Sequence, residues 1–364
     1  MLRNRLLSSV AAVAMVTALA ACGSDDEASG GESAAAPAMP AGESDISGEI
    51  DTSKVQKKLV VGVDNPYYLF HEDILVAEEK GYFDEVGIDT VEIKTIEDPL
   101  PALIGGSLDL ALYDTDTAIA AAAKGAGDIT YLSTYLGGEA NILGVGPGIE
   151  TAEDLKGKTI TGGQFGSRND FLIRKLLTDN GLDPETDVEL VSTGGQSNER
   201  LQSVISGTVD GASLQLRHRS ILEAEGGKFL FEEVAQVPQN GWSVGPLLKE
   251  SPETVAAFLA ATLKARQFIT DMANKEAVLA KAEELDFELP QEYKNAYEDE
   301  NAPDYHTSDG GFEVSDMDDF VETQTELEVI PADTNWRDHT NLVPLWRAQK
   351  ALGLELRPSL ADMQ

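Results

Sequence analysis

The segment Ile104-Gly105-Gly106-Ser107-Leu108-Asp109-Leu110-Ala111 has a second copy, Ile205-Ser206-Gly207-Thr208-Val209-Asp210-Gly211-Ala212, about one hundred residues further along the chain. In each copy a glycine follows an apolar helical pattern, which is typical of a helix end. A hydroxyl residue, an apolar residue and an aspartate then lead into a short apolar run typical of a strand. The two copies predict that one structural unit occurs twice.

Strand-like segments upstream of each copy extend this repeat. Leu59 to Val63 and Thr159 to Gly162 are short β-branched runs at equivalent places, and residues 91–93 and 188–191 supply a second strand in each half. With amphipathic helices between them, each half follows the order strand, helix, strand, helix, strand. Such connections form a mostly parallel sheet with helices on both faces. The sequence therefore predicts an α/β fold with two lobes.

The chain after about Gly245 continues with helical patterns. Ser251-Pro252-Glu253 is typical of a helix start, and apolar residues continue from there to Met272. Further helices are expected near residues 276–284, 315–328 and 342–352. Because an α/β lobe must have its faces covered, we expect this tail to pack on the first lobe.

The N-terminus has the pattern of an export signal. Arg3 and Arg5 precede an apolar run that ends in small residues at Cys22, the only cysteine of the chain. The segment Leu19-Ala20-Ala21-Cys22 resembles the lipobox of bacterial lipoproteins, which implies cleavage after residue 21 and a diacylated Cys22 at the outer face of the membrane. The alternative is an ordinary signal peptide with an incidental cysteine.

Composition separates the following residues from the folded part. Residues 22–57 contain almost no large apolar side chains, which predicts a disordered linker between the anchor and a fold that starts near Lys58. The whole chain has 64 acidic and 27 basic residues, a formal net charge of -37. This charge argues against nucleic acid as a partner. Because it is spread along the chain, it favours solubility and does not predict a cationic ligand.

Four segments together resemble the substrate-binding lipoproteins of ABC importers, in the branch with sulfonate, taurine, nitrate and thiamine-pyrimidine-precursor binders. They lie within residues 58–245 and are Ala77 to Phe83 with Gly87-Ile88, Leu103 to Asp109, Thr151 to Lys158, and Asn180 to Leu182. The resemblance implies a monomeric receptor that delivers its ligand to an ABC permease, without a cofactor or metal. It also implies two crossing strands between lobe one, residues 58–145 plus 241–364, and lobe two, residues 146–240.

The expected ligand cleft lies beyond the carboxyl ends of the strands, where loops and helix N-termini converge. This rule selects thirteen candidate binding residues from the sequence: Asp64, Asn65, Tyr67, Tyr68, Tyr113, Asp114, Thr115, Gln164, Ser167, Arg168, Gln215, Arg217 and Trp242. Five of them are the leading candidates for ligand contacts: Tyr67, Tyr113, Arg168, Arg217 and Trp242.

These residues leave two ligand classes open. Ser167 begins a helix whose free N–H groups, with Arg168 or Arg217, would attract an anion, although an ordinary capping box explains the same pattern. Tyr67 and Trp242 favour a flat or apolar ligand body, with core packing as the alternative. The resembled family often has small apolar residues and a proline where this chain has Asp114 and Asp116. These carboxylates would accept hydrogen bonds from a heterocycle or cap the next helix.

Enzyme motifs are absent from the sequence. The four histidines are scattered, and neither a Gly-x-Ser-x-Gly elbow nor a His-Glu-x-x-His pair occurs. We therefore expect a lipid-anchored receptor for a small organic solute, either aromatic or N-heterocyclic or an organic anion such as a sulfonate or carboxylate. The alternatives are a pyrimidine-synthesising type of enzyme on the same fold and an orphan sensor lipoprotein.

Overall fold

The computed structural model describes residues 37–193, 196–284 and 291–363. Cys22 and the expected signal segment lie outside these residues, so the lipid anchor stays a prediction. Within the described ranges, no helix has the length and apolar character needed to span a membrane.

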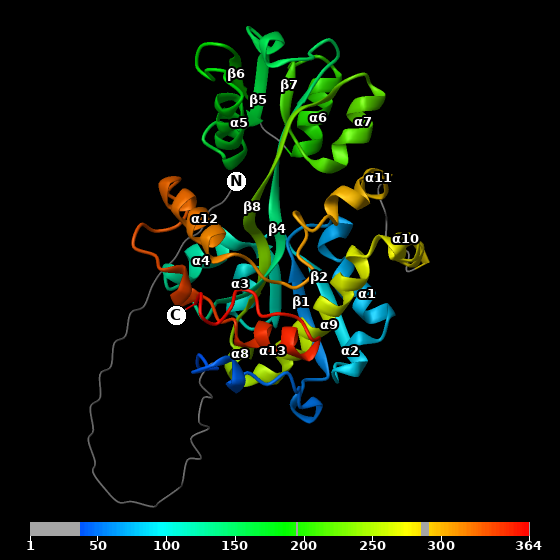
Figure 1. The fold of residues 1–364 in the computed structure, drawn as a ribbon, viewed down its shortest axis with the longest axis vertical. Helices are drawn as coiled ribbons and strands as arrows, with labels where there is room; N and C mark the ends of the chain where they lie inside the picture. The colour runs from blue at the N-terminus through cyan, green and yellow to red at the C-terminus, as the bar shows by residue number, and fades with distance from the viewer. Residues whose placement is uncertain (1–36, 194–195, 285–290, 364) are drawn as a thin grey trace, which may run out of the picture. The chain divides into compact units, whose positions relative to one another are not determined.

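A mixed sheet of eight strands has the order β2-β1-β3-β8-β4-β7-β5-β6. The strands are β1 (Lys58–Val63), β2 (Thr90–Thr95), β3 (Leu110–Asp114), β4 (Thr130–Val145), β5 (Thr159–Gly163), β6 (Glu189–Ser192), β7 (Gly211–Leu214) and β8 (Lys228–Val244). At one end β1 pairs in parallel with β2 and β3, and at the other β5 pairs in parallel with β6 and β7. The long antiparallel strands β4 and β8 join the two ends (Figure 1). The predicted fold class, two lobes joined by two crossing strands, is confirmed.

The internal repeat has a structural reason. Asp109 accepts a hydrogen bond from the Val60 backbone N–H at 2.7 Å, and Asp210 accepts one from the Thr159 N–H at 2.9 Å. In each half the aspartate thus ties the chain before one strand to the start of the strand beside it. The two copies conserve this tie as well as the glycine that ends the helix, since Gly106 and Gly207 both have a φ of 70°.

Helices flank the sheet at both ends. They are α1 (Glu72–Glu79), α2 (Tyr82–Glu85), α3 (Leu100–Ile104), α4 (Thr115–Ala123), α5 (Arg168–Asp179), α6 (Ser197–Ile205), α7 (Arg219–Ala224), α8 (Leu247–Glu250), α9 (Pro252–Thr270), α10 (Lys275–Glu284), α11 (Gln291–Glu300), α12 (Val314–Glu326) and α13 (Val343–Ala351). The long helix α9 packs against α1, α2 and α13, and its apolar side chains belong to the same core as β1 and β3. Separate, smaller cores form around α5 and around α6 and α7.

Residues 37–57, which fall within the expected linker, pack on the C-terminal helices. Ile46 and Val55 are buried, and the Arg347 side chain donates to the Glu49 carbonyl at 2.7 Å. Asn341 donates to the Pro37 carbonyl at 2.8 Å. This part of the linker therefore differs from the free tether that its average composition predicts, because a few spaced apolar residues are enough to bury it.

Candidate ligand-binding site

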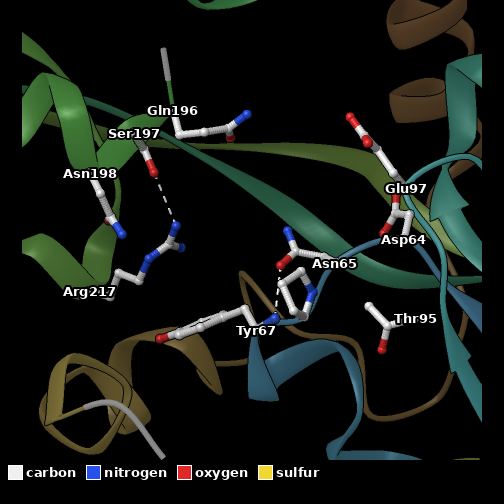
Figure 2. Close-up of a pocket in the computed structure, with 10 residues that line it drawn as sticks. Asp64, Asn65, Tyr67, Thr95, Glu97, Gln196, Ser197, Asn198 and Arg217 are labelled. Atoms are coloured by element: carbon white, nitrogen blue, oxygen red, sulfur yellow. Dashed lines mark hydrogen bonds between the residues drawn. The ribbon is translucent and has the colours of Figure 1, made fainter.

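A cavity of about 680 Å³ lies where loops from the two halves of the sheet face each other. Its volume falls in the range that holds small organic molecules. Figure 2 shows its side chains on two opposite walls. The lining residues are Asp64, Asn65, Pro66, Tyr67, Thr95, Glu97, Gln196, Ser197, Asn198 and Arg217.

Each wall is built from carboxyl ends of parallel strands. Residues 64–67 follow β1. Thr95 is the last residue of β2, and Glu97 lies just after it. On the opposite wall, residues 196–198 stand at the start of α6, after β6, and Arg217 lies in the short 3-10 helix Leu216–His218 after β7. The rule that placed the cleft beyond these strand ends therefore agrees with the position of the cavity.

Local hydrogen bonds fix the loop after β1. The Asn65 side-chain oxygen accepts from the Tyr67 N–H at 2.9 Å, which forms a turn that positions the Tyr67 ring. A ring nitrogen of His71 lies 2.9 Å from the Asn65 carbonyl, within hydrogen-bond distance, and supports the same turn. The wall is thus set by backbone contacts that need no ligand.

Arg217 connects the two walls. Its guanidinium lies over the Tyr67 ring, 4.6 Å from the centroid, in cation–π geometry. The same guanidinium donates to the Ser197 hydroxyl at 3.1 Å. Ser197 in turn donates to the Gln215 side chain at 3.2 Å. The cationic group is therefore held at the edge of the cavity by uncharged partners.

A buried carboxylate stands behind Tyr67. The Tyr67 hydroxyl donates to Glu300 at 2.9 Å, and Glu300 is only 1 % exposed. Burial raises the pKa of Glu300 to about 7, although the positive charge of Arg217 acts to lower it. Burial and the charge of Glu300 also raise the pKa of Tyr67, which stays a neutral donor.

Two aspartates of the cleft have raised pKa values. Burial, assisted by the nearby charge of Asp114, raises the pKa of Asp64 to about 7. Asp114 does not line the cavity, and its residue is exposed, yet the surrounding protein and the charge of Asp116 raise its pKa to about 6. Asn240 donates to Asp114 at 2.7 Å. The cleft therefore offers hydrogen-bond acceptors whose charge changes near neutral pH.

Arg168 lies outside this cavity. Its guanidinium is 2.7 Å from Glu139 and 3.9 Å from Asp116, and 5.2 Å from the centroid of the Phe320 ring. It lines instead a smaller, largely apolar cavity of about 190 Å³ between α5 and α12. One of the two arginines considered for a ligand anion, Arg168, is thus paired with carboxylates of the protein itself.

The helix start before Arg168 matches the capping alternative. The Ser167 hydroxyl accepts from the Asp170 N–H at 3.3 Å, and Asp170 accepts from the Gly166 N–H at 3.0 Å. Gln164 is exposed and does not line the cavity. Asp116 accepts from the Thr117 N–H at 2.6 Å, as expected of a residue that satisfies the start of α4.

Four other candidates are core residues in this structure, which corrects their placement in the ligand cleft. Trp242 is 0 % exposed and packs edge-on against Phe258, with ring centroids 4.8 Å apart. The other three are buried as well and do not line the cavity: Tyr68, Tyr113 and Thr115. The reason is that alternate side chains at a strand end point into the layer of helices, and a sequence does not show which of the two faces lines the cleft.

Several lining residues were not among the sequence candidates. Pro66, Thr95 and Glu97, with Gln196, Ser197 and Asn198, complete the cavity. Thr95 ends β2 and Glu97 follows it, and residues 196–198 follow β6, whereas the candidates were chosen after the first and third strands of each half and from the return crossing. The same strand-end rule, applied to every strand of the repeat, would have selected them.

Comparison with known proteins identifies the family. The family model described as NMT1/THI5 like matches residues 70–275, which is more than half of the chain. The chain belongs to the NMT1/THI5-like family. This result confirms the resemblance inferred from the four sequence segments.

This NMT1/THI5-like chain is similar in sequence to one binding protein and in fold to another. It is 26 % identical over 229 residues to the putative binding protein YtlA of Bacillus subtilis, which covers 60 % of this chain and 68 % of YtlA. The putative periplasmic sulfonate-binding protein SsuA of Methylobacillus flagellatus superposes with a TM-score of 0.64 at 18 % identity, over 83 % of this chain and 96 % of SsuA.

The fold is also shared by an enzyme. The desulfurization enzyme DSZB superposes with a TM-score of 0.56 at 15 % identity, over 81 % of this chain and 99 % of DSZB. Fold alone therefore does not separate binding from catalysis, and the function must be argued from the cavity.

Proposed function

We propose that this protein is a non-enzymatic solute receptor that binds a small polar organic molecule in the cavity between Tyr67 and Arg217. The observation that carries the proposal is the cavity itself, because residues from both halves of the sheet line it and face each other. A ligand held by both walls would stabilise the closed arrangement of the lobes, residues 58–145 plus 241–364 and residues 146–240, and a permease would recognise that state.

The lining favours a solute that carries N–H or O–H donors. Acceptors outnumber cations on its walls, since Asp64 and Glu97 supply carboxylates while Arg217 is the cation among the lining residues. Asn65, Gln196 and Asn198 add neutral amides that both donate and accept. This chemistry suits an amino-bearing heterocycle better than sulfonate or nitrate.

Export and delivery form the second part of the proposal. The N-terminal signal pattern and Cys22 support a receptor tethered to the outer face of the membrane, which hands its solute to an ABC permease. Replacement of Cys22 by serine should release the full-length protein from the membrane fraction. Retention of the Cys22→Ser protein on membranes would contradict the lipid anchor.

A thermal-shift screen of residues 37–364 tests solute binding. The panel should contain amino-pyrimidines and other amino-heterocycles, aromatic carboxylates, alkyl sulfonates and nitrate. A ligand at 100 times its dissociation constant adds about 2.7 kcal/mol to the free energy of unfolding, which raises the melting temperature by several degrees. We expect stabilisation by an amino-heterocycle. Stabilisation by sulfonate or nitrate alone would overturn the proposed ligand class, and a hit unaffected by Tyr67→Ala would place the site elsewhere.

A further inference from the structure

Glu300 lies outside the cavity wall, at the last residue of α11, yet it is linked to the cavity through two contacts. Its carboxylate accepts a hydrogen bond from the Tyr67 hydroxyl at 2.9 Å. The Arg217 guanidinium lies over the Tyr67 ring, 4.6 Å from the ring centroid. Glu300 itself is 1 % exposed. Because the carboxylate is withdrawn from water, its charge acts on Arg217 with little solvent screening.

Without this carboxylate, the wall that carries Arg217 would have the composition of an anion site, while Asp64 and Glu97 stand on the opposite wall. The helix α6 begins at Ser197, and the N–H groups of a helix's first turn attract anions. Arg217 donates to the Ser197 hydroxyl at 3.1 Å, so a guanidinium stands directly beside that helix start. Figure 2 shows Arg217, Ser197 and Asn198 grouped on one wall of the cavity.

We propose that Glu300 is a specificity-determining residue of this cavity, whose buried negative charge offsets Arg217 and thereby excludes small oxyanions. The inference rests on the proposed function in one respect, that the cavity binds a solute. It adds the cause of the selectivity and places it on a residue that does not line the cavity.

Several titratable groups among the described residues interact with Glu300. Tyr67, Arg217, Asp299, Tyr305 and Glu72 all interact electrostatically with it. Burial raises the pKa values of both tyrosines, which stay neutral near neutral pH, and burial also raises the pKa of Glu72 well above its usual range. Arg217 is therefore the cation that Glu300 faces, and loss of the Glu300 charge should leave the Arg217 charge available to a ligand.

The test compares wild type, Glu300→Gln and a matched control, Asp299→Asn. Glutamine keeps an acceptor for the Tyr67 hydroxyl and removes the negative charge, with one carboxylate oxygen replaced by an amide NH2 group. Asp299 is the preceding residue of α11, but its side chain is 50 % exposed and pairs with Arg219 at 3.5 Å. Calorimetric titration with methanesulfonate and with nitrate at pH 8 should show at least about tenfold tighter binding to Glu300→Gln than to wild type or Asp299→Asn. No gain, or an equal gain in Asp299→Asn, would overturn the proposal.

A second measurement decides the case if Glu300→Gln does not fold. The pKa of Asp64 is also about 7 and that of Asp114 is about 6, so the measurement uses the Asp64→Asn/Asp114→Asn protein, in which Glu300 is the one of these three groups that remains. Its affinity for methanesulfonate should rise as the pH falls from 8 to 5.5 and Glu300 takes up a proton. A flat or opposite profile would overturn the role of Glu300.

The outcomes also separate this inference from the proposed function. If wild type binds an amino-heterocycle but Glu300→Gln gains no oxyanion affinity, the role of Glu300 fails and the receptor stands. If Glu300→Gln gains oxyanion affinity while wild type binds no solute with donor groups, the role of Glu300 stands and the proposed ligand class fails.

Discussion

Arg168 and Arg217 both reach from the α5 to α7 half of the molecule to the half that contains β1 to β3, but their partners differ. Arg168 forms a direct ion pair with the buried Glu139 at 2.7 Å. Arg217 rests on the uncharged ring of Tyr67 and lines the larger cavity. The contacts of Arg168 are carboxylates of the protein itself, whereas the direct contacts of Arg217 are neutral groups and its guanidinium faces the cavity.

The largest expected effect comes from removing the ion pair of Arg168, and it is an effect on stability. Replacement of Arg168 by alanine leaves Glu139 buried without its partner, and should lower the free energy of unfolding by about 3 kcal/mol. Urea denaturation measures this loss. The double variant Arg168→Ala with Glu139→Gln should recover most of it, because no uncompensated charge remains. A stable Arg168→Ala protein would show that the ion pair contributes little.

The second largest effect concerns the buried carboxylate near each arginine, Glu139 near Arg168 and Glu300 near Arg217. Glu139 has a direct ion pair, whereas Glu300 accepts from a tyrosine and has a pKa raised to about 7. Because the folded pKa lies above the unfolded value, stability from Glu300 is present at low pH and is lost as the pH rises through 7. Glu300→Gln should thus gain stability relative to wild type as the pH rises. The difference between the two free energies of unfolding should be larger at pH 8 than at pH 5.5 by on the order of 2 kcal/mol.

Wild type and Glu300→Gln have the same other titrating groups. These include the histidines His71, His218 and His306, whose pKa values are lowered by burial. Their effects cancel when the variant is compared with wild type at each pH. An equal difference at pH 5.5 and pH 8, measured by urea denaturation, would show that Glu300 does not change its protonation state between these pH values.

The smallest effect concerns the pH dependence of binding. Asp64 lines the Arg217 cavity, and burial raises its pKa to about 7. Because an ionised Asp64 accepts a stronger hydrogen bond from a donor-bearing solute, affinity should rise by up to about tenfold between pH 6 and pH 8. Calorimetry of Asp64→Asn should show a smaller rise of affinity between pH 6 and pH 8 than calorimetry of wild type. The control Asp116→Asn, beside Arg168, should keep the profile of wild type, and a flattened profile there would contradict the assignment.

The fold was predictable from the sequence because it rests on repeated local signals. The aspartates Asp109 and Asp210 occupy matching positions in the two copies, and both tie the chain to a neighbouring strand. Each half therefore carries its own helix end and strand start, so the order of elements follows from short segments. The tail helices after Gly245 were also visible as periodic apolar patterns.

The candidate site was predictable only in part. Tyr67, Asp64, Asn65 and Arg217 line the cavity, as expected of loops after parallel strands. Trp242 enters the core instead, because the crossing strand turns that side chain toward Phe258. Neither Glu300 nor the partners of Arg168 could be found from local sequence, since each contact joins segments far apart in the chain.

The most direct test is a paired affinity measurement on the two arginine variants. The solute identified in the thermal-shift screen should be titrated by calorimetry into wild type, Arg217→Ala and Arg168→Ala under conditions in which all three are folded. We predict that Arg217→Ala weakens binding at least about tenfold, while Arg168→Ala retains the affinity of wild type. Loss of binding in Arg168→Ala with full binding in Arg217→Ala would contradict the assignment of the cavity as the ligand site.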